Sequence, residues 1–109
     1  MTGRFVPVAP ASALAEGTLL GVALGDERIC LMRVQGAVFA LEDVCPHQGY
    51  PMSTGELVEG NRLECPWHGA QFDCHSGAVV QGPATDPLAT WDVREVDGMI
   101  EIGARRATE

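Results

Sequence analysis

Hydrophobic residues alternate with polar ones in short stretches, and no segment of any length keeps the 3.6-residue period of an amphipathic helix. Apolar runs at 18–24, 28–34 and 37–41 are separated by the turn pairs Gly25-Asp26 and Gln35-Gly36. A glycine-containing pair between two apolar runs is typical of a β-hairpin. The pattern therefore predicts a meander of antiparallel strands across residues 18–41.

The first seventeen residues predict an edge strand and one helical turn. Residues 4–8 contain Pro7, which cannot donate a backbone hydrogen bond and so favours the edge of a sheet. Ser12 can cap a helical turn over residues 12–16, and Gly17 can end it.

The second half of the chain predicts shorter strands and a final hairpin. Strand-forming triplets occur at 56–58, 62–64, 71–73 and 78–80. A Pro-rich connector then leads to strands at 88–96 and 99–102 about the turn Asp97-Gly98, and the tail from Gly103 is expected to fray. The fold class is therefore all-β.

Length and charge restrict the possible functions. The 109 residues are expected to form one domain, 1–109, and the net charge of −8 argues against nucleic acid as a partner, because phosphate binding needs Lys/Arg patches. An acidic surface suits docking on a basic patch of a protein partner. No apolar run has the length of a membrane-spanning helix, and Pro7 and Pro10 interrupt the mildly apolar segment 5–15, so no signal peptide is expected. A cytoplasmic protein without membrane association follows.

Two short segments carry the chemistry of the chain. They are Cys45-Pro46-His47 and Cys65-Pro66-Trp67-His68, and seventeen residues separate His47 from Cys65. Each segment offers one thiolate and one imidazole. Mixed pairs from two loops match the ligation of a Rieske-type 2Fe-2S cluster, in which two cysteines hold one iron and two histidines hold the other.

Three other readings of these residues remain open at this point. Structural zinc also takes two cysteines and two histidines, but familiar zinc spacings place like ligands together. A disulfide between Cys45 and Cys65 would leave both histidines unexplained. A catalytic Cys-His pair would use only one of the two segments.

The segments Cys45-Pro-His-Gln-Gly and Cys65-Pro-Trp-His-Gly-Ala-Gln-Phe-Asp resemble the two halves of the Rieske motif, and the resemblance covers residues 40–102. By length the chain is similar to Rieske ferredoxins of bacterial ring-hydroxylating dioxygenase systems. The resemblance implies a Rieske fold of stacked antiparallel sheets. It also implies a cluster-binding subdomain, about residues 43–84, made of two loops at one tip and covered by a third segment at 82–84. Four residues would ligate the 2Fe-2S cluster: Cys45, His47, Cys65 and His68.

Four positions at which this sequence differs from the high-potential members of the family indicate which subtype of Rieske protein it resembles. Those proteins carry an extra cysteine in each loop, where this chain has Tyr50 and Trp67. They also place a serine and a tyrosine hydroxyl against the cluster sulfurs, where this chain has Ala70 and Phe72. Fewer hydrogen bonds to sulfur destabilise the more negative reduced cluster, so a reduction potential near the low end of the Rieske range, about −150 mV, is expected.

The remaining notable side chains favour structural roles. Cys30, Phe39 and Trp91 fall in strand patterns and are expected in the core, and Cys74-His75 is expected to have a structural or turn role. Five acidic residues near the loops are expected to form a solvated face, of which some could steer a partner: Glu42, Asp43, Glu56, Glu59 and Glu64.

The resemblance implies an electron carrier and not an enzyme. It would accept one electron from a flavin-dependent NAD(P)H reductase and pass it to a terminal Rieske oxygenase, docking at the cluster tip. No 2-His-1-carboxylate iron site is apparent, and no second domain is present to house one. The alternative is a Rieske-like small subunit of an assimilatory nitrite reductase.

Overall fold

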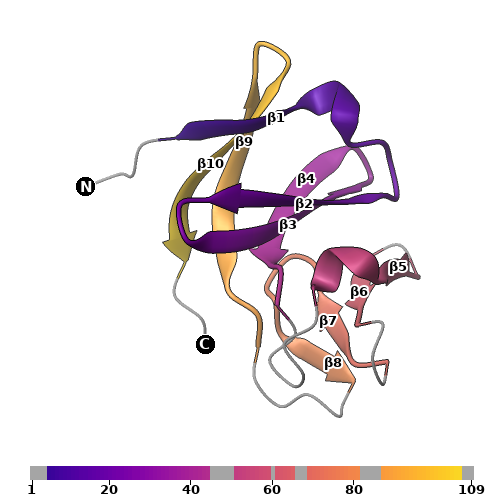
Figure 1. The fold of residues 1–109 in the computed structure, drawn as a ribbon. Coiled ribbons are helices and arrows are strands. Elements are labelled where there is room, and N and C mark those ends of the chain that lie inside the picture. The colour runs from indigo at the N-terminus through magenta and orange to yellow at the C-terminus, as the bar shows by residue number, and fades with distance from the viewer. Residues whose placement is uncertain (1–4, 45–50, 60, 66–68, 82–86, 107–109) are drawn as a thin grey trace.

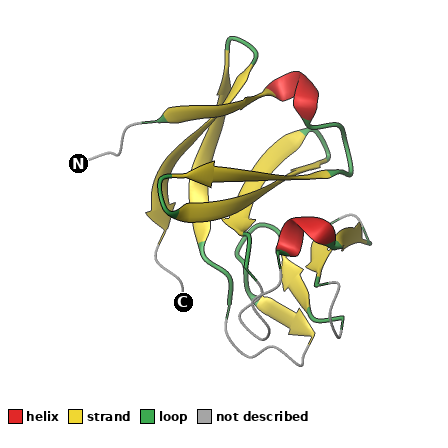
Figure 2. Ribbon diagram, in the orientation of Figure 1, coloured by secondary structure: helices red, strands yellow, loops and turns green. Residues whose placement is uncertain are grey.

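The computed structural model describes residues 5–44, 51–59, 61–65, 69–81 and 87–106. Within these ranges the chain forms strands and two one-turn 3-10 helices, η1 (Ala11–Ala13) and η2 (Met52–Thr54). Neither helix is long enough to cross a membrane, and no other helix is found in the described part of the chain. Figure 2 shows the strands gathered into a larger and a smaller sheet.

The larger sheet has six antiparallel strands in the order β1-β10-β9-β4-β3-β2. Their bounds are β1 (Val6–Pro10), β2 (Leu19–Leu24), β3 (Glu27–Val34), β4 (Ala37–Glu42), β9 (Thr90–Val96) and β10 (Met99–Arg106). The sheet curls so that its two edge strands, β1 and β2, contact each other (Figure 1). The prediction that the Pro7 strand lies at an edge is confirmed.

The smaller sheet lies at one end of the larger sheet, below β4 and β9 in Figure 1. It has four antiparallel strands in chain order: β5 (Glu56–Val58), β6 (Arg62–Glu64), β7 (Gln71–Asp73) and β8 (Val79–Gln81). The first three triplets were predicted with the same bounds. The fourth is shifted by one residue, because Val79 pairs with Phe72 across a bulge.

Strand β3 is buried on both faces, so the strand contributes to two hydrophobic cores. Ile29 and Leu31 lie in the core enclosed by the curled sheet. Cys30 and Met32 point the other way, into a core shared with η2 and the smaller sheet. All four side chains are 0% exposed. The alternation of side chains along one strand therefore joins the two sheets.

Tight turns connect the predicted hairpins. Gln35 and Gly36 have φ values of 53° and 83°, and Asp97 and Gly98 have 52° and 79°. Two consecutive positive φ angles are typical of type I′ turns, whose twist matches that of the flanking strands. Both hairpins were predicted at these pairs, and both predictions are confirmed.

The ends of the chain differ from the sequence prediction. The turn near the N-terminus is η1, which begins one residue before Ser12 and has no side-chain cap. The tail does not fray at Gly103, because β10 continues to Arg106 after a shift in register. Ion pairs of Arg105 with Glu27 and of Arg106 with Asp92 accompany this extension.

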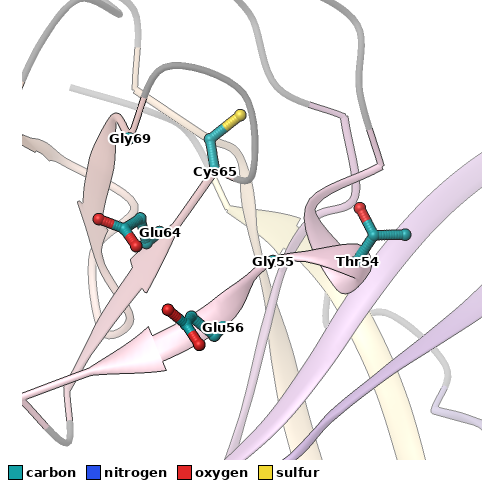
Figure 3. A pocket seen from close by; sticks show the side chains of 6 residues that line it. All are labelled: Thr54, Gly55, Glu56, Glu64, Cys65 and Gly69. Carbon is teal, nitrogen blue, oxygen red and sulfur yellow. The ribbon is translucent and has the colours of Figure 1, made fainter.

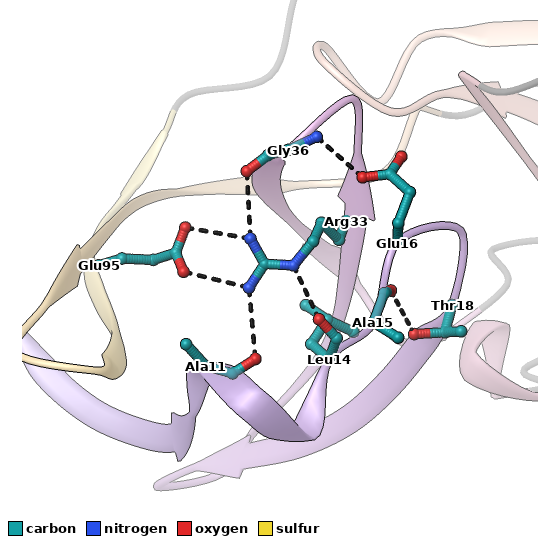
Figure 4. Close-up of polar contacts among 8 residues, drawn as sticks. All are labelled: Ala11, Leu14, Ala15, Glu16, Thr18, Arg33, Gly36 and Glu95. Carbon is teal, nitrogen blue, oxygen red and sulfur yellow. Dashed lines mark hydrogen bonds and ion pairs between the residues drawn. The ribbon is translucent and has the colours of Figure 1, made fainter.

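Arg33 links three segments that lie far apart in the sequence (Figure 4). Its Nε donates to the carbonyl of Leu14 at 2.7 Å, and its Nη atoms donate to the carbonyls of Gly36 at 3.1 Å and Ala11 at 3.3 Å. The same guanidinium makes a two-bond ion pair with Glu95, at 3.1 and 3.2 Å. The side chain is 15% exposed, so solvent screens these contacts only in part.

Gly77 lies where the β7–β8 turn meets the approach to β9. Its φ is +76°, and a Cβ at this position would lie 2.1 Å from the carbonyl oxygen of Leu88. The N–H of Leu88 donates to the carbonyl of Gly77 at 2.8 Å. Only glycine allows this approach of two backbones.

We expect Arg33→Ala to lower the free energy of unfolding by roughly 2–3 kcal/mol, because it removes several charge-assisted hydrogen bonds from a largely buried site. The matched control is Arg106→Ala, which breaks an exposed ion pair and should cost at most about 1 kcal/mol. Chemical denaturation of the two variants measures the difference. Equal losses would contradict the linking role of Arg33.

We expect Gly77→Ala to destabilise the fold far more than Gly98→Ala. Both glycines have nearly the same positive φ, but a Cβ at Gly98 would meet no atom within 4 Å. Gly98→Ala should therefore lower the free energy of unfolding by about 1 kcal/mol, through backbone strain alone. Gly77→Ala should lower it by about 2 kcal/mol more, because the new Cβ also collides with Leu88. Denaturant midpoints of the two variants, compared with the parent protein, test the contact with Leu88.

Candidate metal centre

Of the four predicted cluster ligands, the structure describes one. Cys65 follows the end of β6, whereas Cys45, His47 and His68 lie outside the described residues, as do Tyr50 and Trp67. Within the described ranges, no group of three or more His, Cys, Asp or Glu side chains is placed to hold a metal ion.

Cys65 extends the β6–β7 ladder by one step beyond its last strand pair. Its N–H donates to the carbonyl of Ala70 at 2.7 Å, next to the pairing of Glu64 with Gln71. Cys65 is 1% exposed and belongs to the core shared with Leu63, two residues earlier on the same strand face. Its side chain points away from the carboxylates of Glu64, the preceding residue, and of Glu56 on the neighbouring strand (Figure 3). The predicted ligand is thus a buried thiol at the base of the second loop.

A polar hollow of about 280 Å³ lies beside Cys65 (Figure 3). Glu56 and Glu64, which pair directly across β5 and β6, line it together with Gly55 and Gly69. Small-molecule sites are lined mainly by apolar and aromatic side chains. A hollow lined by two carboxylates and two glycines does not have that character.

The second loop ends at a tight turn that is fixed from two sides. Gly69 in this turn has a φ of +74°, a conformation that glycine adopts without steric cost. Gln81 Nε2 donates to the carbonyl of Gly69 at 3.1 Å, which ties β8 to the end of the loop. Gln71 Nε2 donates to Glu64 Oε2 at 3.2 Å on the outer face of the same hairpin.

Two acidic residues at the end of β4 are structural, which corrects the expectation of a solvated face for them. Asp43 is only 6% exposed, and its carboxylate accepts hydrogen bonds from Ser53. Glu42 Oε1 accepts a hydrogen bond from the N–H of Ala89 at 3.2 Å, beside the bond from the N–H of Glu42 to the carbonyl of Ala89 at 2.8 Å. Their partners are ten and forty-seven residues away in sequence, so no local pattern could have revealed them.

Ala70 and Phe72 lie in the shared core with Cys65, at 1% and 0% exposure. Neither carries a hydroxyl, and both side chains are part of the packed interior. The two positions at which high-potential relatives are expected to donate hydrogen bonds to the cluster are therefore apolar and closed to water in this chain.

The remaining described cysteines have the structural role that was predicted. Cys30 and Cys74 are buried and form no disulfide. Burial raises the pKa of the Cys74 thiol to about 11, and the Asp73 carboxylate adds to that effect. Burial, with a contribution from Asp43, also raises the pKa of Cys30. Both thiols are therefore harder to deprotonate than an ordinary cysteine, whereas a metal ligand must be a thiolate.

The chemistry of the donor set fits a 2Fe-2S cluster of the Rieske type. Cys65 would supply a sulfur ligand at a buried position, and the segment that follows it in the sequence also carries His68. In the sequence, the other thiol–imidazole pair, Cys45 and His47, falls between Glu42 and Ser53, two residues that are fixed in the fold. Two thiolates and two neutral imidazoles are the ligands that such a cluster takes.

The fold and this donor set define a class of protein, and comparison with known families agrees. The Rieske 2Fe-2S domain family matches residues 4–92, most of the chain. The protein belongs to the Rieske 2Fe-2S family, and membership indicates that it holds a 2Fe-2S cluster.

Within that family the chain is similar to ferredoxin components of dioxygenase systems. It is 33% identical over 94 residues to the ferredoxin component of the naphthalene 1,2-dioxygenase system of Pseudomonas putida, covering 86% of this chain and 89% of that protein. It superposes with a TM-score of 0.86 and 30% identity on a chain from the complex of reduced oxygenase and oxidized ferredoxin in carbazole 1,9a-dioxygenase, covering 96% of this chain and 97% of that one.

The same fold also occurs as one part of a larger enzyme chain. The terminal oxygenase of carbazole 1,9a-dioxygenase from Novosphingobium sp. KA1 matches with a TM-score of 0.82 and 28% identity over 92% of this chain. That match covers only 29% of the oxygenase chain. The match thus spans 89% of the naphthalene dioxygenase ferredoxin component and 29% of this oxygenase chain.

We expect the double variant Ala70→Ser plus Phe72→Tyr to raise the midpoint potential of the protein. Each new hydroxyl that donates to a cluster sulfur would stabilise the reduced form by about 1 kcal/mol, which is roughly 40 mV for one electron. Spectroelectrochemical titration measures the shift. Ala78→Ser, which adds a hydroxyl at an exposed turn, should leave the midpoint unchanged. A midpoint that stays the same or falls in the double variant would contradict the account of these two positions.

Proposed function

We propose that this protein is a one-electron carrier of a ring-hydroxylating dioxygenase system, accepting electrons from a flavin-dependent NAD(P)H reductase and passing them to a terminal oxygenase. The observation that carries this proposal is the extent of the structural match. The chain spans 97% of a chain from a ferredoxin–oxygenase complex, but 29% of a terminal oxygenase. The extent of the match therefore favours the carrier.

We assign the cluster to Cys45, His47, Cys65 and His68. When bound, a 2Fe-2S cluster supplies reversible one-electron chemistry. The burial of Cys65 supports the assignment, because it keeps water from the sulfur. The raised pKa values of the Cys30 and Cys74 thiols leave these two as poor competitors for iron.

The chain divides, in this proposal, into a basal part and a cluster-binding subdomain of about residues 43–84. The four-stranded sheet β5–β8 falls within the proposed subdomain, and the six-stranded sheet falls outside it. The hydrophobic core around Cys30 and Met32 packs the four-stranded sheet against the six-stranded sheet. This arrangement supports a rigid base that presents the cluster loops at one end.

Both partners would dock at the cluster tip. The net charge of −8 would accelerate encounter with a basic patch on either partner through electrostatic steering. Glu56 and Glu64 line the hollow beside Cys65 and are suitable surface charges for this purpose. We infer a cytoplasmic location, because NAD(P)H and the reduced thiols Cys30 and Cys74 belong to a reducing compartment.

The comparisons do not favour the alternative of a nitrite reductase small subunit. Two of the similar proteins are ferredoxin components of dioxygenase systems, and the matches cover 86% and 84% of this chain and 89% and 80% of those proteins. We therefore retain the ferredoxin function alone.

We expect Cys65→Ser to abolish the cluster and Cys74→Ser to retain it. The first change removes a proposed ligand, and the second removes a buried neutral thiol from the same core. Iron and sulfide content, the visible spectrum and the EPR signal of the reduced protein measure the outcome. Loss of the cluster in the Cys74 variant alone, or colourless parent protein that contains zinc, would overturn the ligand assignment.

The function itself is tested by reconstitution. The purified protein should support NAD(P)H-dependent turnover by a terminal oxygenase in the presence of a ferredoxin reductase, and Cys65→Ser should not. The naphthalene and carbazole dioxygenase systems provide suitable partners for a first assay. Increasing salt should slow the transfer, because the steering is electrostatic.

A further inference from the structure

One buried carboxylate joins the two ends of the segment that carries Cys45 and His47. Asp43 Oδ1 accepts a hydrogen bond from the backbone N–H of Ser53 at 2.5 Å, and Asp43 Oδ2 accepts one from Ser53 Oγ at 2.9 Å. Asp43 directly follows β4, and Ser53 lies in η2. The two side-chain contacts thus close a loop whose other residues are 44–52.

The Asp43–Ser53 pair lies against strand β2 of the larger sheet. A Cβ at Gly21 in β2 would lie 2.8 Å from Ser53 Oγ and 2.9 Å from Asp43 Oδ2, so the strand leaves room for the pair only because this residue is glycine. The charge of Asp43 also contributes to the raised pKa of the Cys30 thiol in β3. A buried carboxylate is costly unless it is hydrogen-bonded, and here one residue supplies two donors.

The backbone of Asp43 is fixed independently of its side chain. Its N–H donates to the carbonyl of Arg28 at 2.9 Å, and the preceding residue, Glu42, is tied to Ala89. The carboxylate therefore projects from a rigid point on the larger sheet. At the other end of the loop, the single turn η2 has no side-chain cap, and Ser53 is held by the Asp43 contact together with the burial of its neighbour Met52 in the shared core.

We propose that Asp43 is a positioning residue for the first ligand-bearing segment: it fixes η2 against β4 and so sets the geometry in which Cys45 and His47 reach the iron. This inference rests on the proposed function, because it assumes that these two residues are ligands. Fixing both ends of a short loop reduces the conformations available to the residues between them. A second consequence is electrostatic, because a buried negative charge two residues from a ligand disfavours the extra electron of the reduced cluster.

Substitutions can separate the geometric effect from the electrostatic one. Asp43→Asn removes the charge but keeps an oxygen that accepts from the Ser53 N–H. Ser53→Ala keeps the charge and removes one hydrogen bond, and Asp43→Ala removes both the charge and the contacts. Gly21→Ala displaces the pair without altering either member. Asp26→Asn, in the exposed β2–β3 turn, matches the change in net charge and serves as the control.

The readouts are the rate of cluster loss in chelator, the midpoint potential and the EPR line shape of the reduced protein. Asp43→Ala should lose the cluster about tenfold faster than the parent protein. Ser53→Ala and Gly21→Ala should show a smaller acceleration with an altered EPR line shape. Asp43→Asn should hold the cluster within about twofold of the parent rate but move the midpoint to a higher potential. Asp26→Asn should change none of the three.

A purely structural role would lower the unfolding temperature of the variants without moving the midpoint or the EPR line shape. That result in Asp43→Asn and Ser53→Ala would overturn the inference, even if Asp43→Ala fails to fold. It would leave the proposed function intact, since the parent protein would still hold its cluster and transfer electrons. Parent protein without a 2Fe-2S cluster would instead overturn both.

Discussion

The burial of β3 on both faces is the constraint on which the rest of the structure depends. A strand that alternates Ile29 and Leu31 with Cys30 and Met32 has no solvated side, so each face needs its own cover. The curled sheet covers one face, and η2 with the smaller sheet covers the other. The smaller sheet is therefore held by apolar packing on a strand of the base. Such a rigid attachment suits an electron carrier, because its partners then find the same docking surface at every encounter.

The candidate metal centre uses this rigidity through contacts at the ends of its loops. The base of the second loop is closed by the backbone bond from Cys65 to Ala70 and by Gln81 on Gly69. The first loop is closed by the Asp43–Ser53 pair. In each case the fixed residues lie beside the predicted ligands and not among them. The packed fold thus holds the ends of both loops, and the predicted ligand residues would supply the chemistry.

The sequence by itself determined the fold class, most of the strands and the family. Period-two alternation and turn pairs such as Gln35-Gly36 are local signals, so the hairpins could be located from a few adjacent residues. The thiol–imidazole segments are equally local, because the ligand types and their spacing define the metal that they suit. These features need no knowledge of what lies across the fold.

Only the tertiary structure decided which polar residues are buried and what they hold. Aspartate and arginine are usually found at the surface, and nothing near Asp43 or Arg33 in the sequence suggests otherwise. In the folded chain, Asp43 bonds to a residue ten positions away and Arg33 to one sixty-two positions away. The β10 extension beyond Gly103 likewise involves pairing with β9 and the ion pair of Arg105 with Glu27 in β3. Burial and long-range hydrogen bonds are properties of the packed chain, and no neighbouring residue in the sequence encodes them.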